Sequence, residues 1–324
     1  MTEGRAVSEG RAVSVAVTGG SGIVGAAVIR HLVNAGHEVR ALARSTTSGS
    51  AVAALGAIPV PGDILDPESL SDLVGGCSRV FHVAGINELC TRSPKRMWDV
   101  NVEGTRLVVN ACRRSGVQRM VLTSSAVTVG DHDPYLSEYE RTKTEAEKLA
   151  FAEARGLEVV AVNPSSVQGP GRATGSAALI LNAARGKLRY LVDTTISLVD
   201  INDCARGHLL AAERGEPGQR YVLSGATLTM SEAVELLNEI GGGSLNPRYL
   251  SVWLLSVFGL IGELAAKVLR FTPPVCRETA RVMSQSHKYD GSRAVQALGL
   301  EYTPIRRTLE ETVEWFRLEG LLTT

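Results

Sequence analysis

Apolar residues in this chain occur in short uninterrupted runs that alternate with segments of helical spacing. The first run, VSVAVT from Val13, precedes a glycine-rich turn and the helical segment IVGAAVIRHLVN, and further runs read VFHVAG, RMVLTSS and LEVVAVNP. Strands that are apolar throughout, rather than alternating, are typical of a parallel sheet that helices cover on both faces. The pattern therefore predicts an α/β fold with a doubly wound parallel sheet.

The alternation loosens after Asn163-Pro164, where a stretch rich in Gly, Ser and Ala begins. We expect a smaller α+β lobe from there on. A helix with charges on one face is predicted near the end of the chain, in TLEETVEWFRLEGLL. The predicted organisation is a tail at 1–12, a first domain at 13–168 and a second lobe at 169–324, of which segments such as 200–224 return to the first sheet.

One segment of the second lobe, SVWLLSVFGLI (251–261), is apolar and ends at Gly262-Glu263. It is too short to span a bilayer. Three interpretations remain open: a core helix, a flap over an apolar substrate, or an interfacial segment.

Composition excludes some classes of function. The chain has 324 residues, 44% of them apolar, so it can bury a large core. Its formal net charge is +0 and the charges are interspersed, so no basic stripe indicates a nucleic-acid partner. The first residues include acids and no apolar stretch, so we expect no signal peptide and a cytoplasmic protein.

The five cysteines lie far apart, with no CxxC pair and no histidines at metal-ligand spacing. We therefore expect reduced, packed thiols and no metal site. They are Cys77, Cys90, Cys112, Cys204 and Cys276.

A glycine-rich segment, TGGSGIVG (18–25), lies between the first predicted strand and the first predicted helix. Gly19 permits a tight turn, Gly22 lets the backbone approach a pyrophosphate, and Gly25 allows close packing of helix on strand. The helix start adds free N–H groups and a favourable dipole for an anion. In this context the motif predicts a dinucleotide site in a Rossmann-type domain, rather than a merely tight turn.

The second predicted strand ends in Ala43-Arg44, where an enzyme that uses NAD usually carries an acid for the ribose 2′-hydroxyl. A guanidinium there can pair with a 2′-phosphate. NADP(H) is therefore the predicted cofactor, and NAD(H) is the alternative if Arg44 is only a solvated loop residue. Asp63, in GDILD, either approaches the adenine or serves as a helix-entry residue.

Tyr139 is the one tyrosine of the seven that has a lysine, Lys143, four residues later. The segment YERTKTEAEKLAFAEA is rich in helix formers, so the two side chains share a helix face. We expect the ammonium to lower the pKa of Tyr139 from its usual value of about 10 toward working pH. The pair then transfers protons, and Lys143 can also hold a ribose hydroxyl. The alternative is an exposed tyrosine beside a solvated lysine.

A hydroxyl that binds the substrate oxygen is expected at the carboxyl end of a neighbouring strand. RMVLTSSAVTVG supplies Ser125, with Ser124 as the near alternative, although either serine can instead cap a turn. His82, inside a predicted strand, is expected to be a packed core residue rather than a catalyst. Asn101 either bonds to backbone or water behind the tyrosine, or caps a helix.

Segments along nearly the whole chain resemble the extended short-chain dehydrogenases/reductases, in the NAD-dependent epimerase/dehydratase superfamily. These segments are TGGSGIVG, GDILD, VFHVAG, NVEGT, VLTSSAVTVG, YERTK, NPSSVQGPG and LVDINDCARGH, in this order. The chain looks most like the bacterial dihydroflavonol-4-reductase-like proteins, with 3β-hydroxysteroid dehydrogenases and sugar-nucleotide epimerases as cousins.

The resemblance implies a catalytic triad of Ser125, Tyr139 and Lys143. The cofactor contacts that it implies are Gly19, Gly22, Ile23, Gly25, Arg44, Asp63, Ile64, Ala84, Tyr139, Lys143, Pro164 and Val167. A homodimer is also plausible from the family.

The chain departs from the family in two places. Only fourteen residues separate Ser125 from Tyr139, a short connection for the family that weakens inference about the substrate from relatives. Sugar-nucleotide epimerases usually carry an arginine for the diphosphate just before the strand ISLVDIND, where this chain has Ile196. Together with the apolar segment 251–261, this favours an apolar, cyclic or aromatic ketone or alcohol as the substrate.

The predicted function is hydride transfer between NADP(H) and a small-molecule ketone or secondary alcohol, with proton transfer by Tyr139. One alternative is a sugar-nucleotide epimerase or dehydratase that retains NAD. Another, from a different class, is a non-catalytic dinucleotide sensor on the same fold. The identity and stereochemistry of the substrate, the direction of reaction and the oligomeric state are left open by the sequence.

Overall fold

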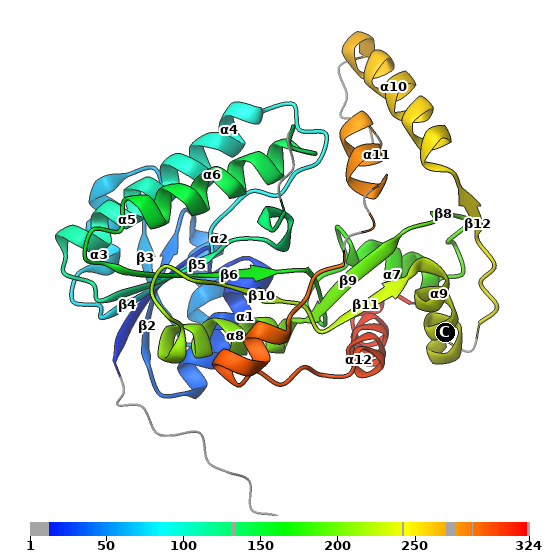
Figure 1. Ribbon diagram of the computed structural model, residues 1–324. Coiled ribbons are helices and arrows are strands. Elements are labelled where there is room, and N and C mark those ends of the chain that lie inside the picture. The colour runs from blue at the N-terminus through cyan, green and yellow to red at the C-terminus, as the bar shows by residue number, and fades with distance from the viewer. Residues whose placement is uncertain are drawn as a thin grey trace, which may run out of the picture.

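A seven-stranded parallel sheet forms the centre of the protein, in the order β10-β6-β5-β4-β1-β2-β3 (Figure 1). The structure is a computed structural model that describes residues 13–130, 134–241, 243–269, 276–284, 286 and 288–322. The predicted doubly wound sheet is confirmed. Its strands are β1 (Ser14–Thr18), β2 (Glu38–Ala43), β3 (Ile58–Pro61), β4 (Arg79–His82), β5 (Arg119–Thr123), β6 (Glu158–Pro164) and β10 (Arg220–Leu223).

Helices cover both faces of this sheet, which explains why its strands are apolar throughout (Figure 1). In β1, Val15 and Val17 belong to the core cluster on one face of the sheet, whereas Ala16 belongs to the cluster on the other face. The first face carries α1 (Ile23–Asn34), α2 (Thr46–Ala53) and α8 (Ile201–Arg214). The second face carries α3 (Pro67–Val74), α5 (Gly104–Arg114) and α6 (Glu138–Ala152), with α4 (Pro94–Trp98) leading into α5 through a π-helical turn, η1 (Asp99–Glu103).

The second lobe is built from two small sheets and several helices (Figure 1). One sheet holds β7 (Ser166–Gln168), β9 (Thr195–Asp200) and β11 (Ala226–Thr229), and the other pairs β8 (Tyr190–Val192) with β12 (Arg248–Leu250). The lobe's helices are α7 (Ala177–Ala184), α9 (Met230–Gly241), α10 (Val252–Leu269), α11 (Arg277–Ser284) and α12 (Ile305–Leu318). The charged helix that the sequence predicts near the end of the chain is α12. Two short turns complete the chain, a 3-10 turn η2 (Ala126–Thr128) and a π-helical turn η3 (Ala294–Leu298).

A disulfide bond joins Cys90, in the loop after β4, to Cys276, at the start of α11. The prediction of reduced cysteines is wrong for this pair, because the two residues are 186 positions apart and only the tertiary fold brings their Cα atoms to 5.9 Å. The other three cysteines are free and buried as expected. Disulfides are typical of oxidising compartments, so the cytoplasmic location stays a prediction.

Residues 252–261 of the apolar segment form the first half of α10, which is not a core helix, since Trp253 is 73% exposed. Within the part of the chain that the structure describes, no helix has both the length and the apolar character needed to cross a membrane.

Candidate functional site

The candidate site lies at the carboxyl ends of the parallel strands, where β1 and β4 are neighbours and the strand order reverses. Ligands of doubly wound sheets bind in such a crevice. The predicted residues come from the strand ends and following loops of β1 to β6, from the start of α1, from α6 and from β7. They are Gly19, Gly22, Ile23, Gly25, Arg44, Asp63, Ile64, Ala84, Ser125, Tyr139, Lys143, Pro164 and Val167.

The glycine-rich turn after β1 has no room for a side chain at Gly19 or Gly25. Gly19 has a φ of +72°, and a Cβ there would lie 2.6 Å from the backbone nitrogen of Ala84 in the loop after β4. A Cβ on Gly25 would collide with the carbonyl of Gly19. Helix α1 begins after Gly22, with no side-chain cap and no acid in its first turn. The chain thus leaves the first-turn N–H groups to an anion, and these residues fit the pyrophosphate of a dinucleotide.

At the end of β2, Arg44 is exposed and the segment through Ser48 carries no carboxylate. Ser45 caps α2 in a reciprocal capping box with Ser48, so the loop has a fixed backbone. After β3, the carboxylate of Asp63 accepts a hydrogen bond from the N–H of Leu65. The cap of α3 is Asp66, so the interpretation of Asp63 as the helix-entry residue is wrong.

Ile64, next to Asp63, is buried and belongs to the core cluster on the α3–α5 face. It packs against the start of α5, where a Cβ on Gly104 would lie 3.1 Å from Ile64 Cγ1.

His82 is a core residue, as predicted, and it organises the crevice through a chain of hydrogen bonds. The Thr18 hydroxyl lies 2.7 Å from His82 Nδ1 and accepts the N–H of Ala84, while Nε2 lies 2.9 Å from the Thr105 hydroxyl. The Thr105 hydroxyl donates its proton to the Asn101 carbonyl at 2.6 Å, so it accepts from Nε2. The proton of the neutral ring is therefore on Nε2, and Thr18 donates to Nδ1. Burial lowers the pKa of His82 to about 3, and the charge of Lys143 acts in the same direction. The ring therefore stays neutral and does not serve as a proton donor in the reaction.

Asn101 holds the loop after β4 in place. Its Oδ1 accepts the N–H of Ile86 at 2.7 Å, and its Nδ2 donates to the Ile86 carbonyl at 2.9 Å and to the Thr142 hydroxyl at 3.0 Å. Of the roles considered for Asn101, bonding to backbone behind the tyrosine is the one that the structure shows. Thr142 lies one residue before Lys143, so Asn101 also links this loop to α6.

Tyr139 and Lys143 lie one turn apart on α6, and a hydrogen bond joins the Tyr139 hydroxyl to the Ser125 side chain. Burial raises the pKa of Tyr139, and this hydrogen bond acts in the opposite direction. The expected lowering of that pKa by Lys143 is therefore wrong for the protein without a ligand. Lys143 itself is 6% exposed and donates from Nζ to the carbonyl of Thr123 at 2.6 Å. Burial lowers its pKa to about 8, and the charge of Glu147 opposes this.

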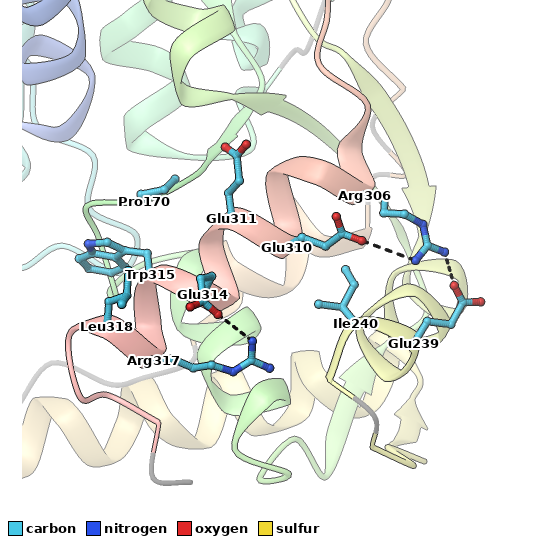
Figure 2. A pocket seen from close by; sticks show the side chains of 10 residues that line it. All are labelled: Pro170, Glu239, Ile240, Arg306, Glu310, Glu311, Glu314, Trp315, Arg317 and Leu318. Atoms are coloured by element: carbon cyan, nitrogen blue, oxygen red, sulfur yellow. Dashed lines mark hydrogen bonds and ion pairs between the residues drawn. The ribbon is translucent and has the colours of Figure 1, made fainter.

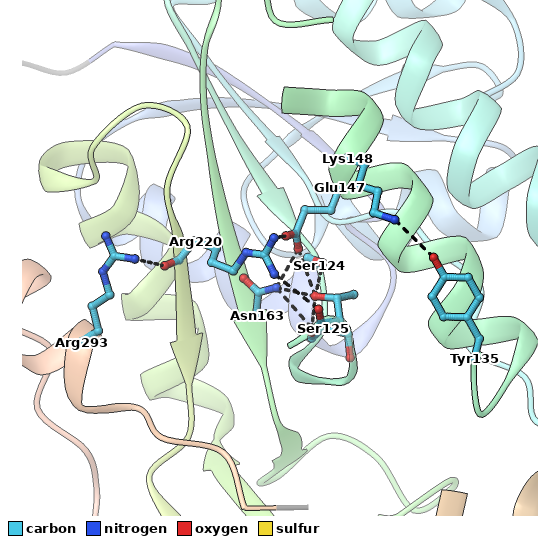
Figure 3. A network of polar contacts seen from close by, with 9 residues as sticks. Ser124, Ser125, Tyr135, Glu147, Lys148, Asn163, Arg220 and Arg293 are labelled. Carbon is cyan, nitrogen blue, oxygen red and sulfur yellow. Dashed lines mark hydrogen bonds and ion pairs between the residues drawn. The ribbon is translucent and has the colours of Figure 1, made fainter. Parts of the chain in front are cut away.

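A buried network supports the turn that carries Ser125 (Figure 3). The Glu147 carboxylate pairs with Arg220 of β10 at 2.9 Å and accepts from Asn163 Nδ2 at 2.8 Å. Asn163 also donates to the Ser125 carbonyl at 3.3 Å and to the Thr128 hydroxyl at 2.9 Å.

Ser124 points into this network, with its hydroxyl 3.5 Å from that of Thr128, whereas Ser125 contacts Tyr139. The sequence reasoning missed Glu147 and Arg220. Glu147 could have been predicted from its spacing, because it lies four residues after Lys143 on the same helix. No sequence feature near Arg220 indicates that it pairs with Glu147.

The second lobe reaches the site through α11. The Glu278 carboxylate accepts the N–H of Cys90 at 2.7 Å and the N–H of Glu138, the first residue of α6, at 2.8 Å. Together with the disulfide between Cys90 and Cys276, this carboxylate holds α11 against the loop after β4 and the start of the helix that carries Tyr139. A negative charge at a helix start is also stabilising.

An open groove between α9 and α12 lies apart from this edge (Figure 2). Arg306 pairs with Glu239 and Glu310, and Arg317 pairs with Glu314. Both cations among the lining residues are therefore neutralised, and the groove contains none of the predicted site residues.

The comparisons with known proteins agree with this geometry. The model of the "NAD dependent epimerase/dehydratase family" matches residues 15–224. A Synechocystis sp. protein named "Putative dihydroflavonol 4-reductase" is 32% identical over 95% of this chain and 96% of its own length. "Sterol demethylase protein B" of Methylococcus capsulatus is 31% identical over 94% of this chain and 99% of its own.

Among solved structures, the crystal structure of gox2253 superimposes with a TM-score of 0.83, at 31% identity over 96% of this chain and 99% of that one. Members of the family and its structural neighbours use NAD(P). This chain therefore belongs to the NAD-dependent epimerase/dehydratase family, the extended short-chain dehydrogenases/reductases, and is an NAD(P)-dependent oxidoreductase.

Proposed function

We propose that the protein uses NADP(H) to interconvert an apolar ketone and its secondary alcohol. The observation that carries this proposal is the cluster of Ser125, Tyr139 and Lys143 at the strand edge that also holds the glycine-rich turn. The hydrogen bond between Tyr139 and Ser125 places their hydroxyls next to each other, so that one substrate oxygen can bind to both.

Each of the three side chains has a separate role. A bound nicotinamide supplies the hydride for reduction or accepts it in oxidation. Tyr139 donates a proton to the substrate oxygen in reduction, which suits a phenol whose pKa burial keeps above its usual value. Ser125 donates a hydrogen bond to the same oxygen and stabilises its developing charge. Lys143 contributes positive charge at pH values below about 8 and binds the cofactor ribose.

The proposed preference for NADP(H) depends on Arg44. Its exposed guanidinium follows β2 with no carboxylate nearby in the loop, so a 2′-phosphate would meet a cation and no repelling acid. The substrate preference depends on Ile196 in β9, which provides no charge for a diphosphate, and the two curated relatives described above are named for a flavonoid and a sterol reaction.

A titration with NADPH and with NADH, followed by fluorescence, tests the cofactor. We expect tighter binding of NADPH, and Arg44→Glu should weaken NADPH binding at least about tenfold while leaving NADH binding nearly unchanged. Arg30→Glu, an exposed charge reversal on α1, is the matched control. Equal binding of the two cofactors, unaffected by Arg44→Glu, contradicts the preference and favours NAD.

An isotope experiment separates reduction from epimerisation. With NADPH deuterated at C4 and a panel of apolar ketones, a reductase transfers deuterium to the alcohol and releases one NADP⁺ per product. An epimerase or dehydratase of this family returns the hydride and consumes no net NADPH. Tyr139→Phe should lower kcat/KM by roughly a hundredfold or more without loss of NADPH binding. Unchanged function of Tyr139→Phe would instead support the non-catalytic sensor.

A further inference from the structure

Helix α10 presents an apolar face that the described residues leave uncovered. Trp253 is 73% exposed, and Phe258, Leu260 and Ile261 are 52%, 43% and 57% exposed. Leu260 and Ile261 lie seven and eight residues after Trp253, so the three side chains form a stripe along the helix. Figure 1 shows α10 standing away from the central sheet, with α11 beside it.

The opposite side of α10 is anchored, which fixes the direction of the exposed face. Leu255 is 7% exposed and packs in one cluster with Val192 and Ala280. Gly259, one turn later, allows a close approach, because a Cβ there would lie 2.7 Å from the carbonyl carbon of Cys276. Since Cys276 is held by the disulfide to Cys90, the helix is attached to the rest of the protein along this side.

Basic residues outnumber acids in the segments around the base of α10. Residues 186–193 and 241–262 contain three basic residues and one acid, the exposed Asp193. A backbone hydrogen bond of 2.9 Å from Arg248 to Arg189 places two of these residues side by side. Tyr190 and Tyr249, from the paired strands β8 and β12, are 57% and 43% exposed. The three basic residues, all exposed, are Lys187, Arg189 and Arg248.

We propose that this surface binds an anionic lipid membrane, with α10 lying in the interface. Tryptophan and tyrosine favour the boundary between headgroups and acyl chains, and an apolar helix face inserts beside them. Basic residues next to the inserted face add attraction to anionic headgroups. The proposal does not depend on the proposed reductase activity, although it would bring the site near apolar compounds dissolved in the bilayer.

The charges near α10 favour an anionic membrane over a second copy of the chain as the partner of this surface. A two-fold contact through α10 would bring the basic residues of both copies to one interface, where each copy supplies only Asp193 against three cations. An anionic surface, in contrast, is attracted by the same charges.

Flotation of the full-length protein with phosphatidylcholine vesicles, with and without phosphatidylglycerol, tests the proposal. We expect binding to the anionic vesicles that weakens as salt is added. The double variant Trp253→Ser/Ile261→Ser should lose at least about tenfold in binding, whereas Leu318→Ser, which removes a 77% exposed leucine on α12, should not. Arg248→Glu should lose at least about fivefold, and Arg114→Glu, an exposed charge reversal on α5, serves as its control.

Circular dichroism and NADPH binding show that each variant is folded. Trp253 should also shift its fluorescence to shorter wavelength when anionic vesicles are added, a signal that Trp253→Phe removes. Absence of binding to anionic vesicles, or equal binding by the double variant, overturns the proposal. So does a dimer in gel filtration that the double variant dissociates, because the face would then be an interface between copies.

Discussion

Lys143, the lysine of the proposed catalytic cluster, is expected to lower the stability of the protein. Its folded-state pKa is lowered from 10.5 to about 8, because burial disfavours the charged ammonium. Each pKa unit corresponds to about 1.4 kcal/mol, so the charged lysine costs about 3 kcal/mol of folding free energy at neutral pH. Replacement by methionine, an unbranched apolar residue, removes this cost.

The expected net gain is smaller, because Lys143→Met also removes the hydrogen bond from Nζ to the Thr123 carbonyl. That bond contributes about 1 kcal/mol. We therefore expect Lys143→Met to raise the free energy of unfolding by about 2 kcal/mol at pH 7, while kcat/KM falls by roughly a hundredfold or more.

The gain in free energy of unfolding on Lys143→Met should also depend on pH. The lowered pKa of Lys143 determines that the gain shrinks as the pH rises. Between pH 8 and 10.5 the unfolded chain keeps the lysine proton and the folded chain has lost it, so the stability of the native protein rises with pH. Near pH 10 the cost of the charge is below about 1 kcal/mol, and the variant should have little or no advantage.

Urea unfolding of the cofactor-free protein at pH 7 and pH 10 measures this difference. Tyr139→Phe, which is expected to remove activity without removing a buried cation, is the matched control. Its difference in free energy of unfolding from the wild type should be about the same at the two pH values. A Lys143→Met protein that is less stable than the wild type at pH 7, or equally stabilised at both pH values, refutes the reasoning.

Three further perturbations test other parts of the structure. Glu147→Gln removes the charge that raises the pKa of Lys143, so the alkaline limit of the kcat/KM profile should move to lower pH; an unchanged profile contradicts this link. Cys276→Ser opens a cross-link between residues 186 positions apart, and urea unfolding should show a loss of up to about 5 kcal/mol that dithiothreitol reproduces in the wild type. Gly25→Ala should cost more than about 2 kcal/mol and abolish NADPH binding, because a Cβ collides with backbone, whereas Gly241→Ala, with open space around it, should be nearly neutral.

The parts of the site that the sequence predicted depend on local geometry. The glycine spacing of TGGSGIVG describes one turn, and the spacing of Tyr139 and Lys143 describes one helix face, so neither needs knowledge of the rest of the fold. The apolar runs predicted the parallel sheet for the same reason, because a strand covered on both faces must be apolar throughout.

Only the tertiary structure decided the contacts between distant segments and the degree of burial. The disulfide of Cys90 and Cys276 and the ion pair of Glu147 and Arg220 join residues far apart in the chain, whose meeting depends on how the strands are ordered and how the second lobe packs. The pKa of Tyr139 moved opposite to the expectation because desolvation, a property of packing, raises it more than the hydrogen bond with Ser125 lowers it. Similarly, the apolar run 251–261 predicts a helix that buries apolar side chains. Only the packing of α10 on α11 decided which of its faces is buried and which is exposed.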